Sequence, residues 1–177
     1  MSNVDSSSNK INKLFPLGIK IESVLGLLKA LNDVFNKHAD IFALANYFDL
    51  EADDLLPVLD VIELLEFALI QGGDVIITPQ GEKFLKSSSS VKRQILRDKL
   101  KNFEPFKTAI SILSKSNELK VEDVAKELEN MGYSEVNEFG FDEKLSQTLI
   151  EWGVYAGILI YSSENQVFKL NKKHIKV

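Results

Sequence analysis

The side chains of this sequence that could perform chemistry are carboxylates, two histidines and a run of serines. Acids cluster at positions 53, 54, 60 and 63, where they could chelate magnesium, although capping and the helix dipole already explain acids at a helix start. His38 and His174 have no cysteine to join them, so we expect neither histidine to bind a metal. Serines 87–90 have no neighbouring base, and nothing indicates a pocket that raises the pKa of a carboxyl group. The sequence therefore predicts a protein that is not an enzyme and needs no cofactor.

Composition points to an ordinary folded protein. The 177 residues are 45% hydrophobic and 27% charged, and none is cysteine, which excludes disulfides and thiolate chemistry. No apolar run approaches the ~20 residues that a membrane-spanning helix needs. The N-terminus is polar and unlike a signal peptide, so we predict a flexible tail over residues 1–17 and a cytoplasmic location.

The charge is unevenly distributed along the chain. The net charge is -5, yet residues 83–107 hold eight bases against two acids. A negative protein disfavours nonspecific binding to nucleic acid, and this basic stretch is where that argument could be reversed. Arg93, Arg97 and Lys101 are spaced four apart, so with Lys92 they form one stripe on a helix. The stripe could bind phosphate or an acidic partner, but we favour a solvated face or docking within the chain.

The first half of the sequence has the element order of a winged helix. Apolar spacing predicts helices over residues 21–35, 40–48 and 53–65, with Asp40 and Asp53 as N-caps and Pro57 near the first turn of the third helix. Residues 67–70 and 75–77 flank a glycine turn and form a hairpin. Thr78 and Pro79 then start a short helix. These elements make a first module over residues 18–86.

The same order returns after a connecting helix. Residues 87–104 contain this helix, which Ser90 can cap, and residues 105–172 form the second module. That module has helices over 106–113, 121–131 and 142–155 and a hairpin over 158–170. The predicted fold class is mainly α with small β-hairpins, arranged as two tandem winged-helix modules joined by the connecting helix.

Trp152 is the expected anchor of the second module. Leu145, Leu149 and Trp152 form a stripe that faces a core, and Tyr155 and Tyr161 lie close enough in sequence to pack on the same ring. We therefore expect Trp152 to be buried against the hairpin, whereas an exposed ring would indicate a binding platform for a ring or a peptide.

Several segments resemble one protein family. Residues 55–58 (LLPV), 64–67 (LLEF) and 73–81 (GDVIITPQG), together with 150–156 (IEWGVYA) and Tyr161, are similar to the AAA-associated C-terminal domain. That domain ends the ATP-binding subunits of nitrate/sulfonate/bicarbonate-type ABC transporters and also occurs as free-standing proteins in archaea and bacteria. The resemblance implies an accessory or regulatory module over residues 20–170. The sequence itself has no phosphate-binding loop of the Gly-x-x-x-x-Gly-Lys-Ser/Thr type.

The third predicted helix argues for a protein partner. In DNA-binding winged helices it enters the major groove with basic and amide side chains, but residues 53–66 carry five acids and no base. Asp53, Asp60 and Glu63 are our candidate protein-interaction face. We predict a regulatory module that binds a protein such as an ABC-type ATPase subunit and pairs with itself as a homodimer. The alternative is a DNA-binding transcription regulator that uses the basic stripe.

Overall fold

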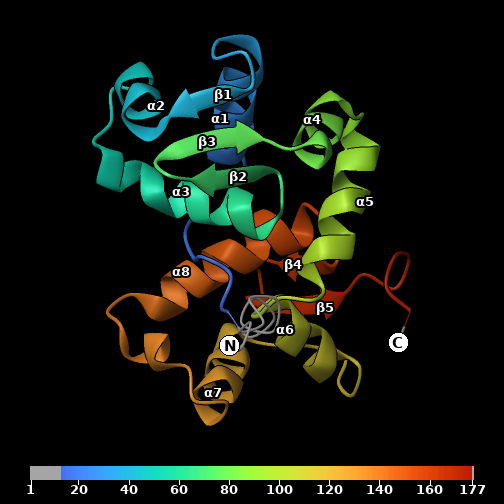
Figure 1. Ribbon diagram of the computed structural model, residues 1–177. Helices are drawn as coiled ribbons and strands as arrows, with labels where there is room; N and C mark the ends of the chain where they lie inside the picture. The colour runs from blue at the N-terminus through green and yellow to red at the C-terminus, as the bar shows by residue number, and fades with distance from the viewer. Residues whose placement is uncertain (1–12, 177) are drawn as a thin grey trace, which may run out of the picture. The chain divides into compact units, whose positions relative to one another are not determined.

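The chain divides into two units, and it crosses from one to the other between residues 18 and 19 and again between residues 92 and 93. The computed structural model describes residues 13–176 (Figure 1). We call residues 19–92 the first unit, and residues 13–18 with 93–176 the second unit. The prediction of a mainly α fold with small β-hairpins is confirmed for both. The predicted connecting helix is α5 (Ser89–Leu100), and the division between the units falls inside it.

The first unit combines helices with a three-stranded antiparallel sheet. Its elements are α1 (Ile21–Asp33), β1 (His38–Asp40), α2 (Ile41–Tyr47), α3 (Ala52–Leu64), β2 (Ala68–Gln71), β3 (Asp74–Ile77) and α4 (Pro79–Lys86). The strand order is β1-β3-β2, so β1, which apolar patterning did not reveal, completes the sheet beside the predicted hairpin (Figure 1). Ala39 and Val75 are paired in register and buried, which turns one face of the sheet toward the core.

Local signals position most of these elements. The Asp40 carboxylate accepts hydrogen bonds from the backbone N–H groups of Phe42 and Ala43, which confirms the predicted N-cap of α2. Two glycines with positive φ form the predicted turn between β2 and β3. The Thr78 hydroxyl accepts from the Gly81 N–H, and Pro79 occupies the first position of α4. In each case a short stretch of sequence carries the information.

Two predicted helix starts are wrong. Helix α3 begins at Ala52, so Asp53 is the second helical residue and Glu51, in extended conformation, occupies the cap position. Pro57 consequently lies inside the helix, beyond its first turn, where its nitrogen has no hydrogen to donate to the preceding turn. Helix α5 begins at Ser89, which places Ser90 in its first turn, and the Ser88 hydroxyl instead accepts from the Val91 N–H at 3.4 Å. A serine run offers several alternative caps, and the sequence does not distinguish among them.

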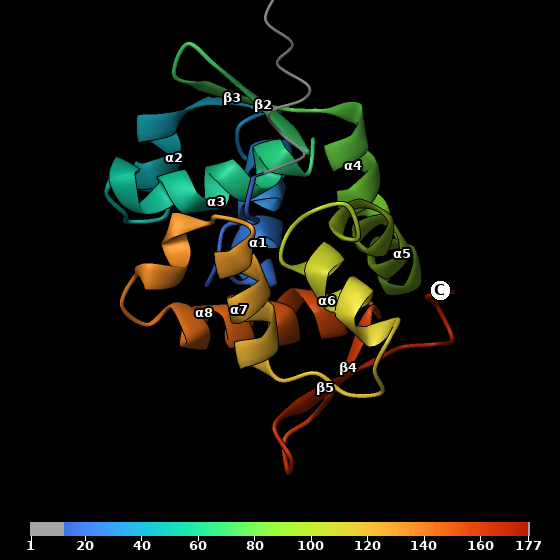
Figure 2. The same ribbon diagram turned by 90° about the horizontal axis from the view of Figure 1, so that it is seen from below.

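The second unit, like the first, has helices followed by a hairpin, but it has no counterpart of α4 among the described residues. It contains the end of α5 and then α6 (Phe106–Leu113), α7 (Val121–Asn130), the 3₁₀ turn η1 (Ser134–Asn137), α8 (Phe141–Thr148), its π-helical continuation η2 (Leu149–Val154), β4 (Leu159–Ser162) and β5 (Val167–Leu170). Leu119, between α6 and α7, exchanges backbone hydrogen bonds of 3.0 and 2.8 Å with Phe168 of β5. This short pairing corresponds to β1 of the first unit. Figure 2 shows the turn of the β4–β5 hairpin extending beyond the helices of this unit.

The core of the second unit is aromatic. Trp152 is 0% exposed, which confirms its predicted burial, and its ring lies edge-on to Phe15 at 5.0 Å. Phe15 also meets Phe106 at 5.5 Å, and its N–H donates to the carbonyl of Glu104 at 2.7 Å. The tail predicted over residues 1–17 therefore ends inside the fold, because Leu14 and Phe15 are buried; residues 1–12 lie outside the described residues.

The two tyrosines near Trp152 have other neighbours. The Tyr161 ring packs on Phe168 at 4.8 Å, across the β4–β5 hairpin. The Tyr155 ring lies beneath the guanidinium of Arg93, with 5.3 Å between the guanidinium carbon and the ring centre. The sequence suggested that these two tyrosine rings pack on Trp152. The ring that lies edge-on to Trp152 is that of Phe15, which is distant from it in sequence.

Candidate functional site

The candidate interaction face lies on α3. Asp53 and Asp60 are exposed and Glu63 is half-buried, and their spacing places all three on one side of the helix. The apolar residues on the other sides of α3, for which the sequence predicted no particular contact, are mostly buried. Leu56 remains 45% exposed. The structure therefore presents α3 to solvent as an acidic surface with one large apolar side chain.

A second acidic helix borders a groove in the second unit. Asp142 and Glu143 are exposed at the start of α8, and Glu151 is half-buried in η2. Between this helix and the β4–β5 hairpin lies a groove of about 540 Å³, with Ile150 and Tyr161 on its walls. Here carboxylates stand beside accessible apolar groups, an arrangement that favours contact with a partner carrying both apolar and basic side chains.

The basic stripe of α5 makes contacts within its own units. The Arg97 Nε donates to the carbonyl of Ala156 at 2.9 Å, just beyond the end of η2. Arg93 covers Tyr155, and the Lys101 ammonium lies 3.6 Å from the Asp98 carboxylate. The Lys92 ammonium donates to the carbonyl of Ser87 at 2.8 Å. The four basic side chains of the stripe thus contact two backbone carbonyls, one aromatic ring and one carboxylate of this chain.

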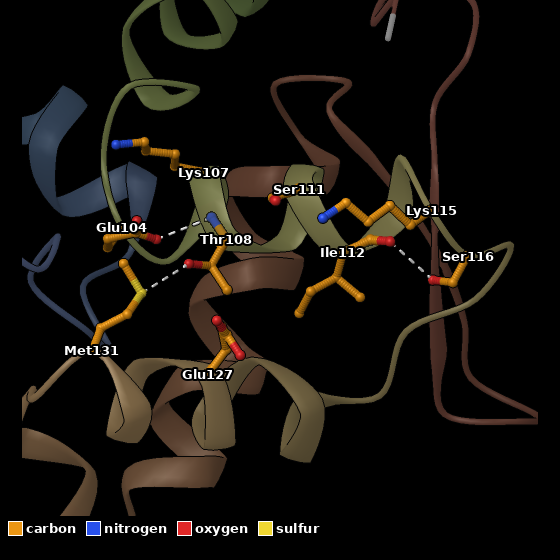
Figure 3. Close-up of a pocket in the computed structure, with 9 residues that line it drawn as sticks. All are labelled: Glu104, Lys107, Thr108, Ser111, Ile112, Lys115, Ser116, Glu127 and Met131. Carbon is orange, nitrogen blue, oxygen red and sulfur yellow. Dashed lines mark hydrogen bonds between the residues drawn. The ribbon is translucent and has the colours of Figure 1, made fainter.

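A cavity of about 430 Å³ lies between α6 and α7 (Figure 3). The buried Glu104 carboxylate accepts from the Thr108 N–H at 3.0 Å, so it caps the first turn of α6. The Thr108 hydroxyl points to the Met131 sulfur at 3.7 Å, and Glu127 faces them from α7 (Figure 3). Sequence reasoning missed Glu104, although an acid directly before Pro105 and a helix start is a usable capping signal.

One phenol in the second unit, that of Tyr133, has a shifted pKa. Burial raises the pKa of the Tyr133 phenol above its ordinary value of 10.0, and the charges of Glu104 and Glu135 act in the same direction. Tyr133 therefore stays protonated across the physiological range. A general acid or base needs a pKa near the working pH, which this shift moves further away.

The histidines are not brought into a metal site in the part of the chain that the structure describes. His38 pairs with Asp74 across β1 and β3, with 3.1 Å between Nε2 and a carboxylate oxygen. His174 lies beside Gly157 in the second unit. Among residues 13–176, no group of three or more histidines and carboxylates is placed to hold a metal ion. Nor does any helix in this range have the length and apolar character needed to cross a bilayer.

Comparison with protein families gives a match over most of the chain. The family model described as the C-terminal AAA-associated domain matches residues 42–162, from the start of α2 to the end of β4. The match includes parts of both units, which confirms the resemblance seen in the sequence, over a shorter range than residues 20–170. No curated protein and no solved structure matches the chain.

Proposed function

Because the chain belongs to the family of C-terminal AAA-associated domains, we propose that it is a non-catalytic accessory module that binds and regulates an ATPase of the ABC type. The family match, which covers both units, is the observation that carries the proposal. The 177 residues contain no phosphate-binding loop of the Gly-x-x-x-x-Gly-Lys-Ser/Thr type, and in this proposal the ATPase domain carries out the nucleotide chemistry. We place this activity in the cytoplasm, where the ATP-binding subunits of such transporters work.

We further propose that both units are winged helices. The support is a shared order in which a short strand segment follows the first helix, two helices come next, and a hairpin ends the series. In both units this segment pairs with the second hairpin strand, as β1 with β3 and as Leu119 with Phe168. Winged helices bind proteins as well as DNA, so the fold alone does not select the partner.

The surface charges favour a protein over nucleic acid. The helices that would enter a DNA groove expose Asp53, Asp60, Asp142 and Glu143, which repel phosphates. The arginines of the basic stripe contact Tyr155 and a backbone carbonyl, so binding DNA would require them to leave these neighbours. We therefore propose the α3 acids, Asp53, Asp60 and Glu63, as part of the surface that meets the ATPase.

The test uses the full chain as an immobilised bait in nuclease-treated native extract. We expect mass spectrometry to identify an ATP-binding transporter subunit, and recovery to fall when Asp53→Asn, Asp60→Asn and Glu63→Gln are combined. The matched control replaces Glu122, Glu127 and Glu129 with Gln, which removes the same charge from exposed positions of α7. Recovery of nucleic acid and no ATPase from untreated extract would overturn the proposal in favour of a DNA-binding regulator.

Self-association is part of the proposal. The exposed Leu56 on α3 and the half-buried Val154 leave apolar surface that a second copy of the chain could cover. Sedimentation equilibrium of the purified chain should show a dimer that dissociates on dilution. A strict monomer at high concentration would remove the homodimer and leave the accessory role unaffected.

A further inference from the structure

The groove between the α8–η2 helix and the β4–β5 hairpin has an accessible apolar wall. Ile150 is 36% exposed, and Val121, at the start of α7, is half-buried beside it. The Tyr161 ring forms the hairpin side and is held by Phe168 at 4.8 Å, so it is in place before anything binds. The volume of about 540 Å³ has room for a few apolar side chains of a bound segment.

The charge at the edge of this groove is of one sign. Asp142 and Glu143 are exposed, and neither forms an ion pair with another residue of the range 13–176 that the structure describes. The base that follows them, Lys144, directs its side chain beside Gly18 and does not line the groove. The carboxylates are therefore left to interact with charges outside the chain.

From this geometry we infer that the groove is a docking site for a basic amphipathic segment of a partner protein, one that inserts apolar side chains against Ile150 and Tyr161 and presents lysines or arginines to Asp142 and Glu143. The inference rests on the proposed function, because it specifies the kind of segment on the partner protein that this chain would bind. Binding would combine burial of apolar area with ion pairs at the rim, the division of roles usual for such interfaces.

Charge complementarity selects this occupant over others. Nucleic acid would bring phosphates against the rim carboxylates, which repel them. A second copy of this chain carries a net charge of -5, which disfavours its approach to the rim carboxylates, and Arg93 and Arg97 of its basic stripe already contact Tyr155 and the Ala156 carbonyl.

The test measures binding of a labelled probe peptide to the full chain by fluorescence anisotropy. The probe is a helical peptide of leucine and lysine, with leucines spaced three and four apart, and its control has glutamate in place of lysine. We expect the lysine peptide to bind and the glutamate peptide not to bind. Asp142→Asn with Glu143→Gln should weaken binding about tenfold, as expected for the loss of two charge pairs at a partly exposed rim.

Matched variants separate the groove from general attraction by a negative protein. Glu127→Gln with Glu129→Gln removes the same charge from exposed α7 positions outside the groove and should change the affinity by less than about twofold. Ile150→Ser keeps the charge and should weaken binding several-fold by removing the apolar wall. Trp152 emission verifies that each variant is folded, and Glu143→Lys offers an independent charge change should the double variant not fold.

Four results would overturn the inference. The lysine peptide could fail to bind, the α7 control could lose as much affinity as the groove variant, or Asp142→Asn with Glu143→Gln could abolish a homodimer, which would make a second copy the occupant. Recovery of the ATPase by the full chain with the groove substituted would reject the groove and leave the proposed function standing. If the unsubstituted chain fails to recover an ATPase from the extract, the proposed function itself is rejected.

Discussion

Phe15 offers the sharpest test of the fold, because sequence and structure give it opposite roles. As part of a flexible tail it could be replaced without effect. In the structure it is 0% exposed, and its ring lies between Phe106 at 5.5 Å and Trp152 at 5.0 Å. Phe15→Ala should therefore destabilise the second unit strongly.

The magnitude follows from the area that the ring buries. A buried aromatic side chain removes about 150–250 Å² from water, and at ~25 cal/mol per Å² this corresponds to roughly 4–6 kcal/mol. Because the remaining alanine keeps part of that area buried, we expect a loss of about 3–5 kcal/mol in the free energy of unfolding, the range found for phenylalanine-to-alanine changes in cores. The two edge-to-face ring contacts, which area alone does not count, argue for the upper half of this range.

The assay is urea unfolding followed by tryptophan fluorescence. Trp152 is the single tryptophan of the chain, so its emission reports on the second unit and on the ring that Phe15 touches. At a urea dependence of about 2 kcal/mol per M, the midpoint should fall by roughly 2 M. The control is Phe139→Ala, the same substitution at a fully exposed position of the same unit, which should stay within about 0.5 kcal/mol of wild type. A Phe15→Ala midpoint equal to that of the control would refute the packing described here.

Three further changes test other parts of the structure. Trp152→Ala should destabilise the second unit by ~3–5 kcal/mol, measured by far-UV circular dichroism, and wild-type Trp152 should emit blue-shifted light and resist acrylamide; a red-shifted, quenchable emission would contradict its burial. Gly81→Ala should lower the melting temperature of the first unit, because the added Cβ would meet the Phe67 carbonyl oxygen; an unchanged melt would show that this approach is not close. The ammonium of Lys37, 3.0 Å away, lowers the pKa of Glu82 below 4.5, so the contribution of this pair is present at neutral pH and is lost as the pH falls through the folded-state pKa. Wild type should thus lose more stability than Glu82→Gln on acidification below about pH 5, and parallel pH profiles would contradict the shift.

The elements that the sequence predicted well are those whose signals are local. Helix α6 has the predicted bounds, since its apolar spacing and the preceding proline lie within one short segment. The turn between β2 and β3 needs positive φ at two positions, and only Gly72 and Gly73 meet that need nearby. The Thr78 cap is likewise decided within four residues.

The features that the sequence did not reveal depend on residues far apart in the chain. Strand β1 has three residues and becomes a strand only by pairing with β3. The ring that packs on Trp152 comes from residue 15, and no periodicity links these two positions. The groove beside α8 likewise exists only because the hairpin returns to that helix. Such contacts are fixed by tertiary packing, which overrides the local pattern on which sequence reasoning relies.

The contacts of α5 weaken the case that its positive charge binds nucleic acid. The basic stretch was the one feature that favoured nucleic acid, and its arginines contact other residues of their own unit. Arg97 lies at the carbonyl end of η2, where a positive charge also meets the negative end of the helix dipole. Arg93 is drawn to the face of Tyr155 by the same kind of attraction. Positive charge used in this way is less available for a ligand, whereas Asp53, Asp60, Asp142 and Glu143 remain at the surface. A partner approaching the third helix of either unit therefore meets carboxylates first, and this is the physical reason to seek a basic protein surface before a nucleic acid.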